Sequence, residues 1–125
     1  MSEVFYEPAS ENHAEIEIKK SRFIGTVRRI RSAEEARDLV RREKAGHPDA
    51  RHVVFAFLLG GPKSETAGLS DDGEPKGTAG RPVFEVLRGS GVRNALVTVT
   101  RYFGGTKLGT GGLVKAYSEC ARAVL

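Results

Sequence analysis

The spacing of hydrophobic and polar residues changes along this chain, and the changes predict its strands and helices. Ala14, Ile16 and Ile18 alternate with charged residues, as in a strand that is buried on one face. A later segment is apolar almost throughout, as in a central strand covered on both faces. The predicted strands are residues 13–19, 22–30, 51–59 and 94–102.

Three other segments carry apolar residues at helical spacing. Ser32 and Glu35 form a capping box, which predicts a helix that begins near Ala33. Gly46 and Pro48 are expected to end it. The other predicted helices are a short one from Pro82 to about Gly89 and a last one from Gly112 to Leu125.

This order of elements, β-β-α-β-α-β-α, predicts an α+β fold with one mixed sheet and helices packed on it in two layers. Residues 1–12 lack periodicity and are expected to form a loose arm, so that residues 13–125 make a single domain. Residues 60–80 also lack periodicity and are dense in turn residues. A loop of this length inside a domain is often functional.

Composition narrows the class of protein. With 39% hydrophobic and 29% charged residues in 125, the chain has the profile of a soluble globular domain. It has no apolar run long enough to span a membrane, and its acidic beginning is unlike a signal peptide. The single cysteine, Cys120, lies on the apolar face of the last predicted helix, which favours a core residue in a reducing, cytoplasmic setting.

Positive charge is unevenly distributed. The net charge is +4, but residues 19–51 hold 11 Lys and Arg against five Asp and Glu, whereas residues 1–18 hold five acids and no base. A basic block suits a phosphate backbone or an acidic protein surface, although a solvated helix face has the same appearance. The basic residues that we assign to a binding patch are Lys19, Lys20, Arg22 and Arg28.

A glycine-rich segment joins the last predicted strand to the last predicted helix. Backbone N–H groups at such a junction, with the positive end of the helix dipole, can bind an anion; the alternative is a tight structural turn. The segment is not a P-loop, because Thr110 stands where the phosphate-binding lysine belongs. The candidate phosphate or nucleic-acid ligands are Arg101, Gly104, Gly105, Lys107, Gly109, Thr110, Gly111 and Gly112. Tyr102 and Phe103 could stack a base or be part of the core.

The loop of residues 60–80 contains Asp71, Asp72 and Glu74 close together. Three carboxylates can hold Mg²⁺ or Ca²⁺, but acidic turns capped by their own backbone are commoner, and we assign no metal. His52 could act as a base with one of these acids or be a satisfied, half-buried residue. We assign no catalytic residue and no cofactor. The functional-loop candidates are His52, Ser70, Asp71, Asp72, Glu74, Lys76 and Thr78.

Four segments together resemble the N-terminal domain of the IMPACT/YigZ family. They are residues 19–25 (KKSRFIG), 47–52 (HPDARH), 70–82 (SDDGEPKGTAGRP) and 101–117 (RYFGGTKLGTGGLVKAY). The resemblance implies a fold like a domain shared by a ribosomal protein, elongation factor G and the GHMP kinases. It also implies a second, ferredoxin-like C-terminal domain in full-length members, and a role in regulating translation.

The leading hypothesis is therefore a translation-associated module without catalytic activity. It would bind RNA, the ribosome or a translation-regulating protein, and not a membrane. The rival hypothesis is an enzyme or binder of a small molecule or nucleotide phosphate, which requires His52 and the acids of the 60–80 loop to face the glycine-rich segment across a pocket. A third possibility is that the two loops mainly brace each other.

Overall fold

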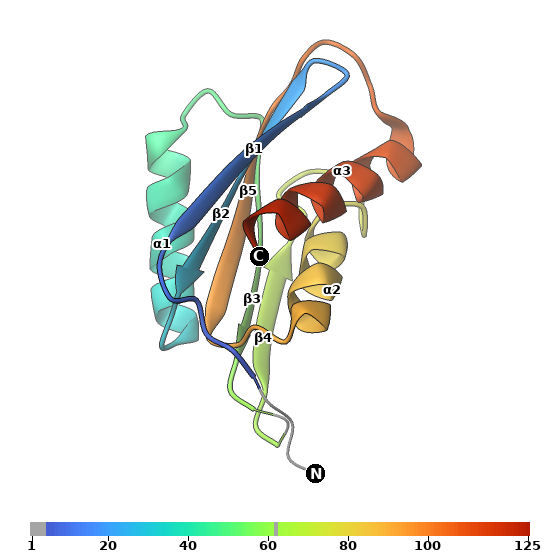
Figure 1. The fold of residues 1–125 in the computed structure, drawn as a ribbon. Helices are drawn as coiled ribbons and strands as arrows, with labels where there is room; N and C mark the ends of the chain where they lie inside the picture. The colour runs from blue at the N-terminus through green and yellow to red at the C-terminus, as the bar shows by residue number, and fades with distance from the viewer. Residues whose placement is uncertain (1–4, 62) are drawn as a thin grey trace.

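Five antiparallel strands form one sheet in the order β1-β2-β5-β3-β4, and three helices pack on it (Figure 1). The structure is a computed structural model that describes residues 5–61 and 63–125. Its elements are β1 (Asn12–Ile18), β2 (Ser21–Arg29), α1 (Ala33–Gly46), β3 (His52–Leu59), β4 (Thr66–Ser70), α2 (Gly80–Ser90), β5 (Ala95–Tyr102) and α3 (Gly109–Val124). The last strand in sequence is thus the central strand of the sheet.

The helices cover both faces of the sheet, with α1 on one face and α2 and α3 on the other (Figure 1). Side chains of a strand alternate between its two faces, and β3 follows this rule. Val54, Ala56 and Leu58 belong to the larger core under α2 and α3, whereas Phe57 packs with Val40 and other residues under α1.

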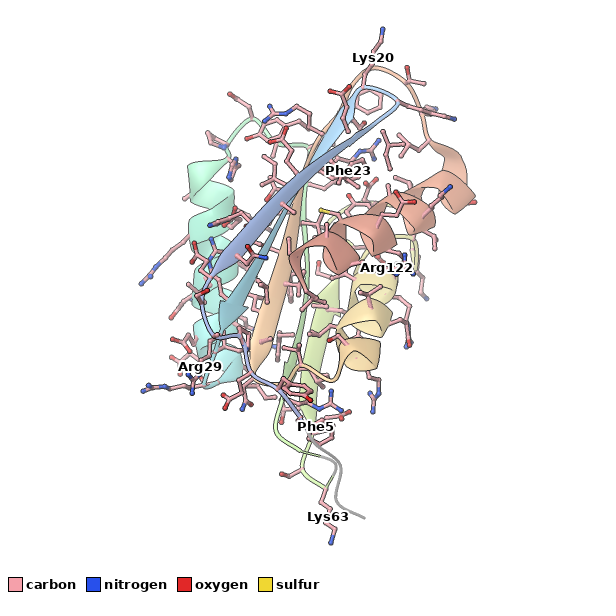
Figure 2. All side chains as sticks on the ribbon, in the orientation of Figure 1. Phe5, Lys20, Phe23, Arg29, Lys63 and Arg122 are labelled. Carbon is pink, nitrogen blue, oxygen red and sulfur yellow. The ribbon has the colours of Figure 1, made fainter. Side chains whose placement is uncertain are left out.

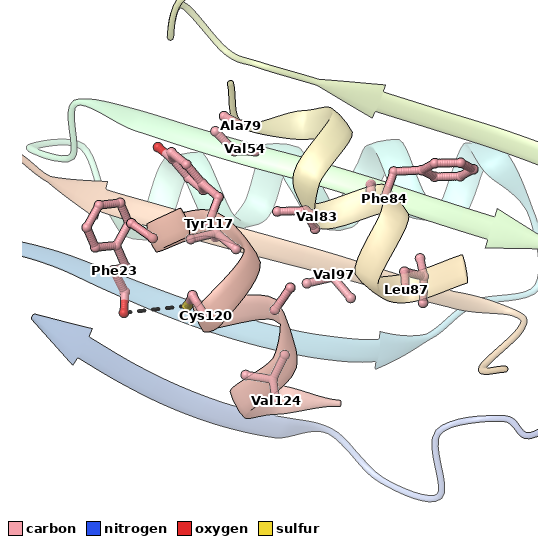
Figure 3. Packing of buried hydrophobic residues seen from close by; sticks show 14 of the residues in the cluster. Phe23, Val54, Ala79, Val83, Phe84, Leu87, Val97, Tyr117, Cys120 and Val124 are labelled. Atoms are coloured by element: carbon pink, nitrogen blue, oxygen red, sulfur yellow. Dashed lines mark hydrogen bonds between the residues drawn. The ribbon is translucent and has the colours of Figure 1, made fainter. Parts of the chain in front are cut away.

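Helix α3 approaches the sheet closely where it crosses β2 (Figure 3). A Cβ atom on Gly25 would lie 2.8 Å from Cys120 Sγ and 2.9 Å from Val124 Cγ1, so only glycine allows this approach. The buried Sγ atom is 3.7 Å from the Phe23 carbonyl oxygen, and burial raises the pKa of the Cys120 thiol to about 12. Cys120 is therefore a core residue, as the sequence predicts.

The predicted α+β class is confirmed, and the seven predicted elements occur in the predicted order. Ser32 caps α1 as expected, because its Oγ accepts from the Glu35 N–H at 3.0 Å. Three features differ from the prediction. The sheet is antiparallel throughout, the helices lie on both faces of it, and β4 forms inside the segment that lacked periodicity. Strand β4 has the sequence TAGLS and no fully buried side chain, so it lacks the apolar core face by which a strand is recognised in a sequence.

Residues 1–12 were expected to form a loose arm; residues 1–4 lie outside the described part of the chain, and Tyr6 makes backbone contacts. The Tyr6 N–H donates to the Gly91 carbonyl at 3.0 Å, and the Arg93 N–H donates to the Tyr6 carbonyl at 2.7 Å. These bonds hold residue 6 beside the loop between α2 and β5. Among the described residues, no helix has both the length and the apolar character needed to cross a membrane.

Candidate nucleic-acid interface

Two loops meet at one end of the sheet, the β1–β2 turn and the glycine-rich loop after β5 (Figure 1). The Gly104 N–H donates to Ser21 Oγ at 3.2 Å. A Cβ atom on Gly104 would lie 2.1 Å from the Lys20 carbonyl carbon, so a side chain at this position would separate the loops. The sequence motif around Gly104 thus has a structural role, as one of the two readings predicts.

Lys19 and Lys20 form the two-residue turn between β1 and β2. Both have left-handed backbone conformations, with φ angles of 49° and 69°. Hairpin turns of this kind normally use Asn-Gly, because other side chains are strained at positive φ. The turn nevertheless carries two exposed lysines, and Lys20 extends from the end of the molecule (Figure 2).

The glycine-rich segment is partly loop and partly helix. Helix α3 begins at Gly109, three residues earlier than predicted, so residues 109–112 are its first turn. Gly109 and Gly105 have φ angles of 76° and 88°, which explains glycine at these positions. The N-cap residue, Leu108, provides no side-chain acceptor. The first N–H groups of a helix lack acceptors within it, and the anion site expected at this helix end stays a prediction.

Arg101 is placed differently from the expected phosphate ligand. Its side chain is 5% exposed, and its Nη1 donates to Glu74 Oε2 at 2.7 Å while Nη2 donates to Ser21 Oγ at 3.2 Å. Its Nε is buried and has no hydrogen-bond partner among the described residues. Arg101 is thus an internal cation that ties β5 to the 60–80 loop and to the start of β2.

Glu74 is the centre of a buried polar network. Its Oε2 accepts from Arg101 and also from the Tyr117 hydroxyl at 2.6 Å. Burial and this hydrogen bond raise the pKa of Tyr117, so the phenol keeps the proton that it donates. The Tyr117 ring packs edge-on against Phe23, with centroids 5.2 Å apart. This role of Tyr117 was not predicted, although a hydroxyl on the apolar face of a helix indicates a buried hydrogen-bond partner.

His52 completes the network from the β3 side. Its Nδ1 lies 2.7 Å from the Asp72 carbonyl oxygen, and since that oxygen can only accept, Nδ1 must carry a proton. Its Nε2 lies 3.3 Å from Glu74 Oε1. The His52 side chain is 14% exposed. It is the satisfied, half-buried histidine of the sequence analysis, at the edge of a cavity.

A cavity of about 350 Å³ lies between this network and the start of α3. Its walls include the groups that the rival hypothesis needed, namely His52 and Glu74 on one side and Gly109 on the other. Asp71 and Asp72 do not line it. The residues that line the cavity are Arg51, His52, Glu74, Pro75, Arg101, Phe103, Lys107, Leu108, Gly109, Thr110 and Leu113.

Asp71 and Asp72 instead stabilise the backbone. Asp71 accepts from the N–H groups of Gly77 at 2.9 Å, Ala79 at 3.2 Å and Gly80 at 2.8 Å. Burial alone would raise the pKa of Asp71, but these three donors outweigh it and the pKa is lowered. Asp71 therefore caps α2, whose own N-cap is an alanine.

Asp72 joins the 60–80 loop to β3 and α1. Its carboxylate accepts from the Val53 N–H at 2.8 Å and from Lys44 Nζ at 3.0 Å. Desolvation alone would raise the pKa of Asp72, yet these donors outweigh it and the pKa is lowered.

The other candidates of the 60–80 loop also make local contacts or face solvent. Ser70 Oγ accepts from the Asp72 N–H, and the Thr78 hydroxyl donates to the Pro75 carbonyl. Lys76 is exposed. Within residues 5–61 and 63–125 no cluster of three acids, histidines or cysteines could hold a metal.

The predicted basic patch divides into two parts. Arg28 lies at the far end of β2 and is paired with Glu11 and Glu43. Arg22 is exposed but its guanidinium binds Glu15, which raises its pKa. Among the described residues, Lys19, Lys20, Arg51 and Lys107 have no carboxylate within ion-pair distance, and all four are exposed. We call these four residues the basic end.

One aromatic side chain accompanies the basic end. Phe103 is 40% exposed, and the Cζ atoms of Arg51 and Arg101 lie 4.8 Å and 5.5 Å from its ring centroid. Tyr102 is half-buried on the α1 face, where its hydroxyl lies 2.5 Å from His47 Nδ1. Of the two aromatic candidates, only Phe103 is thus available to a ligand at this end.

Comparisons with known proteins agree on one family. Residues 19–125 match the model of the Impact N-terminal domain. The chain is 53% identical over 102 residues to IMPACT family member YigZ of Escherichia coli K12, covering 81% of this chain and 50% of YigZ. It is 43% identical over 105 residues to YvyE of Bacillus subtilis 168, covering 84% of this chain and 48% of YvyE. The chain thus spans about half the length of these curated relatives.

Two solved structures share the fold. A crystal structure described as that of a hypothetical protein superposes with a TM-score of 0.91 at 47% identity, covering 94% of this chain and 58% of that one. The two-domain translational regulator Yih1 superposes with a TM-score of 0.58 at 21% identity, covering 99% of this chain and 48% of Yih1. The second likeness shows the fold alone.

Proposed function

Because this chain belongs to the Impact N-terminal domain family, we propose that it is a module of translation regulation that binds RNA through its basic end. A structural relative, Yih1, is described as a translational regulator, which supports a role in the same process. The proposed role is binding without catalysis, because Asp71 and Asp72, two of the acids that the rival hypothesis requires, accept from backbone N–H groups and do not line the cavity.

The observation that carries this proposal is the Lys19–Lys20 turn. Positive φ angles at non-glycine residues cost free energy and persist where the position serves another purpose. Here the strained residues are two exposed lysines beside the start of α3, and Arg51 and Lys107 lie at the same end of the sheet. Unpaired cations beside an exposed aromatic ring suit single-stranded RNA, whose phosphates and unstacked bases both need partners.

The test is RNA binding by fluorescence anisotropy across a salt series. The Lys19→Asn/Lys20→Gly variant removes two cations and supplies the usual turn residues, so it weakens binding without harming the hairpin. The slope of log K against log salt is expected to fall by about 1.4, because each phosphate contact to a single strand contributes about 0.7. The Lys107→Ala variant is expected to reduce the slope by about 0.7. Arg101 is unsuitable for this test because it is buried and ion-paired.

The matched control is Lys115→Ala/Arg122→Ala, which removes the same charge from exposed positions of α3 outside the basic end. Its salt slope is expected to equal that of the unmodified protein. Equal losses in both double variants would show that binding follows net charge alone. No binding at low salt would reject RNA and leave an acidic protein surface as the partner of the basic end.

A further inference from the structure

The cavity beside the basic end has the chemistry of a site for a small anion. Lys107 and Arg51 contribute positive charge to its walls, and the first turn of α3 contributes Gly109 and Thr110. Glu74 also lines the cavity, but its charge is matched by Arg101 at 2.7 Å. The local field is therefore positive.

A buried cation forms part of the cavity wall beside the helix end. Arg101 is 4% exposed and lines the cavity, and its Nε has no hydrogen-bond partner among the described residues. The neighbouring donors of Arg101 are already bound to Glu74 and Ser21, which fixes the guanidinium in place.

The remaining walls are apolar and too extensive for a bare phosphate. Pro75, Phe103, Leu108 and Leu113 line a volume of about 350 Å³, which is in the range of small-molecule pockets. Arg51 lies over Phe103 with its Cζ atom 4.8 Å from the ring centroid, so its planar guanidinium is held at the cavity wall. Guanidinium planes of this kind stack on nucleobases.

We propose that this cavity binds one nucleoside monophosphate unit. Its phosphate would meet Lys107, the Thr110 hydroxyl and the N–H groups of the first turn of α3, and its base would lie against Arg51 and the apolar wall. This inference deepens the proposed function, since the cavity opens beside the basic end. The nucleotide is either free in solution or one residue of a bound RNA, and the two sources present the same chemistry.

The experiment is isothermal titration calorimetry of the whole chain with AMP, GMP, CMP and UMP, and with inorganic phosphate for comparison. Lys107→Ala is expected to weaken binding of the nucleotides about tenfold, because one charge-assisted contact is lost. Lys115→Ala, which removes the same charge from an exposed position of α3, is expected to have no effect. Arg51→Lys keeps the charge and removes the planar group, so it should weaken the nucleotides but not phosphate.

The outcomes separate this inference from RNA binding. Absence of nucleotide binding, or an equal effect of Lys107→Ala and Lys115→Ala, overturns the inference even if RNA binds. Binding of inorganic phosphate as tightly as of the nucleotides overturns the assignment of a base site. If a nucleotide displaces labelled RNA, the cavity holds a residue of that RNA; if it binds without displacing RNA, the ligand is free nucleotide. Nucleotide binding by a protein that binds no RNA supports the inference and rejects the proposed function.

Discussion

At the scale of single residues, Asp71 shows how an acidic cluster can have a structural purpose. Its carboxylate accepts from three backbone N–H groups, including those of Ala79 and Gly80 at the start of α2. Its pKa lies below the usual value of 3.8 because these donors outweigh desolvation. A lowered folded-state pKa stabilises the protein above the usual value, and this stabilisation is lost as the pH falls through the folded-state pKa.

Asp71→Asn keeps one acceptor oxygen but removes the negative charge and the oxygen that accepts from Gly77, so it should lower the free energy of unfolding at neutral pH by about 1–2 kcal/mol. The difference from the unmodified protein should shrink as the pH falls below the usual value of 3.8 and through the lowered folded-state pKa of Asp71, because its carboxylate then becomes protonated. Urea unfolding at several pH values measures this. Lys76→Ala, at an exposed position of the same loop, is the control. A difference that stays constant with pH would contradict a role for the charge.

At the scale of elements, the β1–β2 hairpin combines a strained turn with a regular ladder. Seven residue pairs, from Asn12–Val27 to Ile18–Ser21, join the two strands. The turn residues Lys19 and Lys20 have positive φ, which costs about 1 kcal/mol at each non-glycine residue. The hairpin is thus less stable than one of the same length whose turn residues adopt positive φ without strain.

Lys19→Asn/Lys20→Gly should raise the free energy of unfolding by about 1 kcal/mol, because both new residues adopt positive φ more easily. The same variant is expected to bind RNA more weakly, so stability and binding change in opposite directions. Thermal unfolding measures the first quantity. A variant that is less stable than the unmodified protein would show that the lysine side chains stabilise the turn. It would contradict the claim that the turn is strained.

Elements with a strong local signal were predictable from the sequence, and those defined by contacts were not. Helix α1 is marked by Ser32 and Glu35, and β3 by its apolar run. Strand β4 is defined by its pairing with β3. Its five residues of mixed polarity do not predict this contact. Likewise, α3 begins at Gly109, whereas the local spacing of apolar residues places its start at Gly112.

At the scale of the whole molecule, the Glu74 network connects elements that are distant in sequence. It joins β2 through Ser21, β5 through Arg101 and α3 through Tyr117. Arg101 and Glu74 were predicted from the sequence as residues of two separate sites, and their ion pair was not predicted. Sequence spacing carries no information about a contact between residues 27 positions apart.

Glu74→Ala should lower the free energy of unfolding by about 3–5 kcal/mol, because it leaves the guanidinium of Arg101 buried without its counter-ion. Replacing both partners by apolar residues, in Glu74→Leu/Arg101→Met, should recover part of this loss. Chemical denaturation of the two variants gives the comparison. A double variant that is no more stable than the single one would show that the remaining partners of Glu74, and not Arg101, determine the cost.

The position of β5 at the centre of the sheet has a consequence for synthesis of the protein. The two hairpins, β1–β2 and β3–β4, leave the ribosome before β5, and they do not pair with each other. Strands β2 and β3 both pair with β5, and β1 and β4 form the two edges of the sheet. Strand β5 is buried along nearly its whole length, and α3, which covers the larger core, follows it. The nascent chain therefore cannot close this sheet or bury this core until both β5 and α3 have emerged, so these eight elements fold as one event after α3.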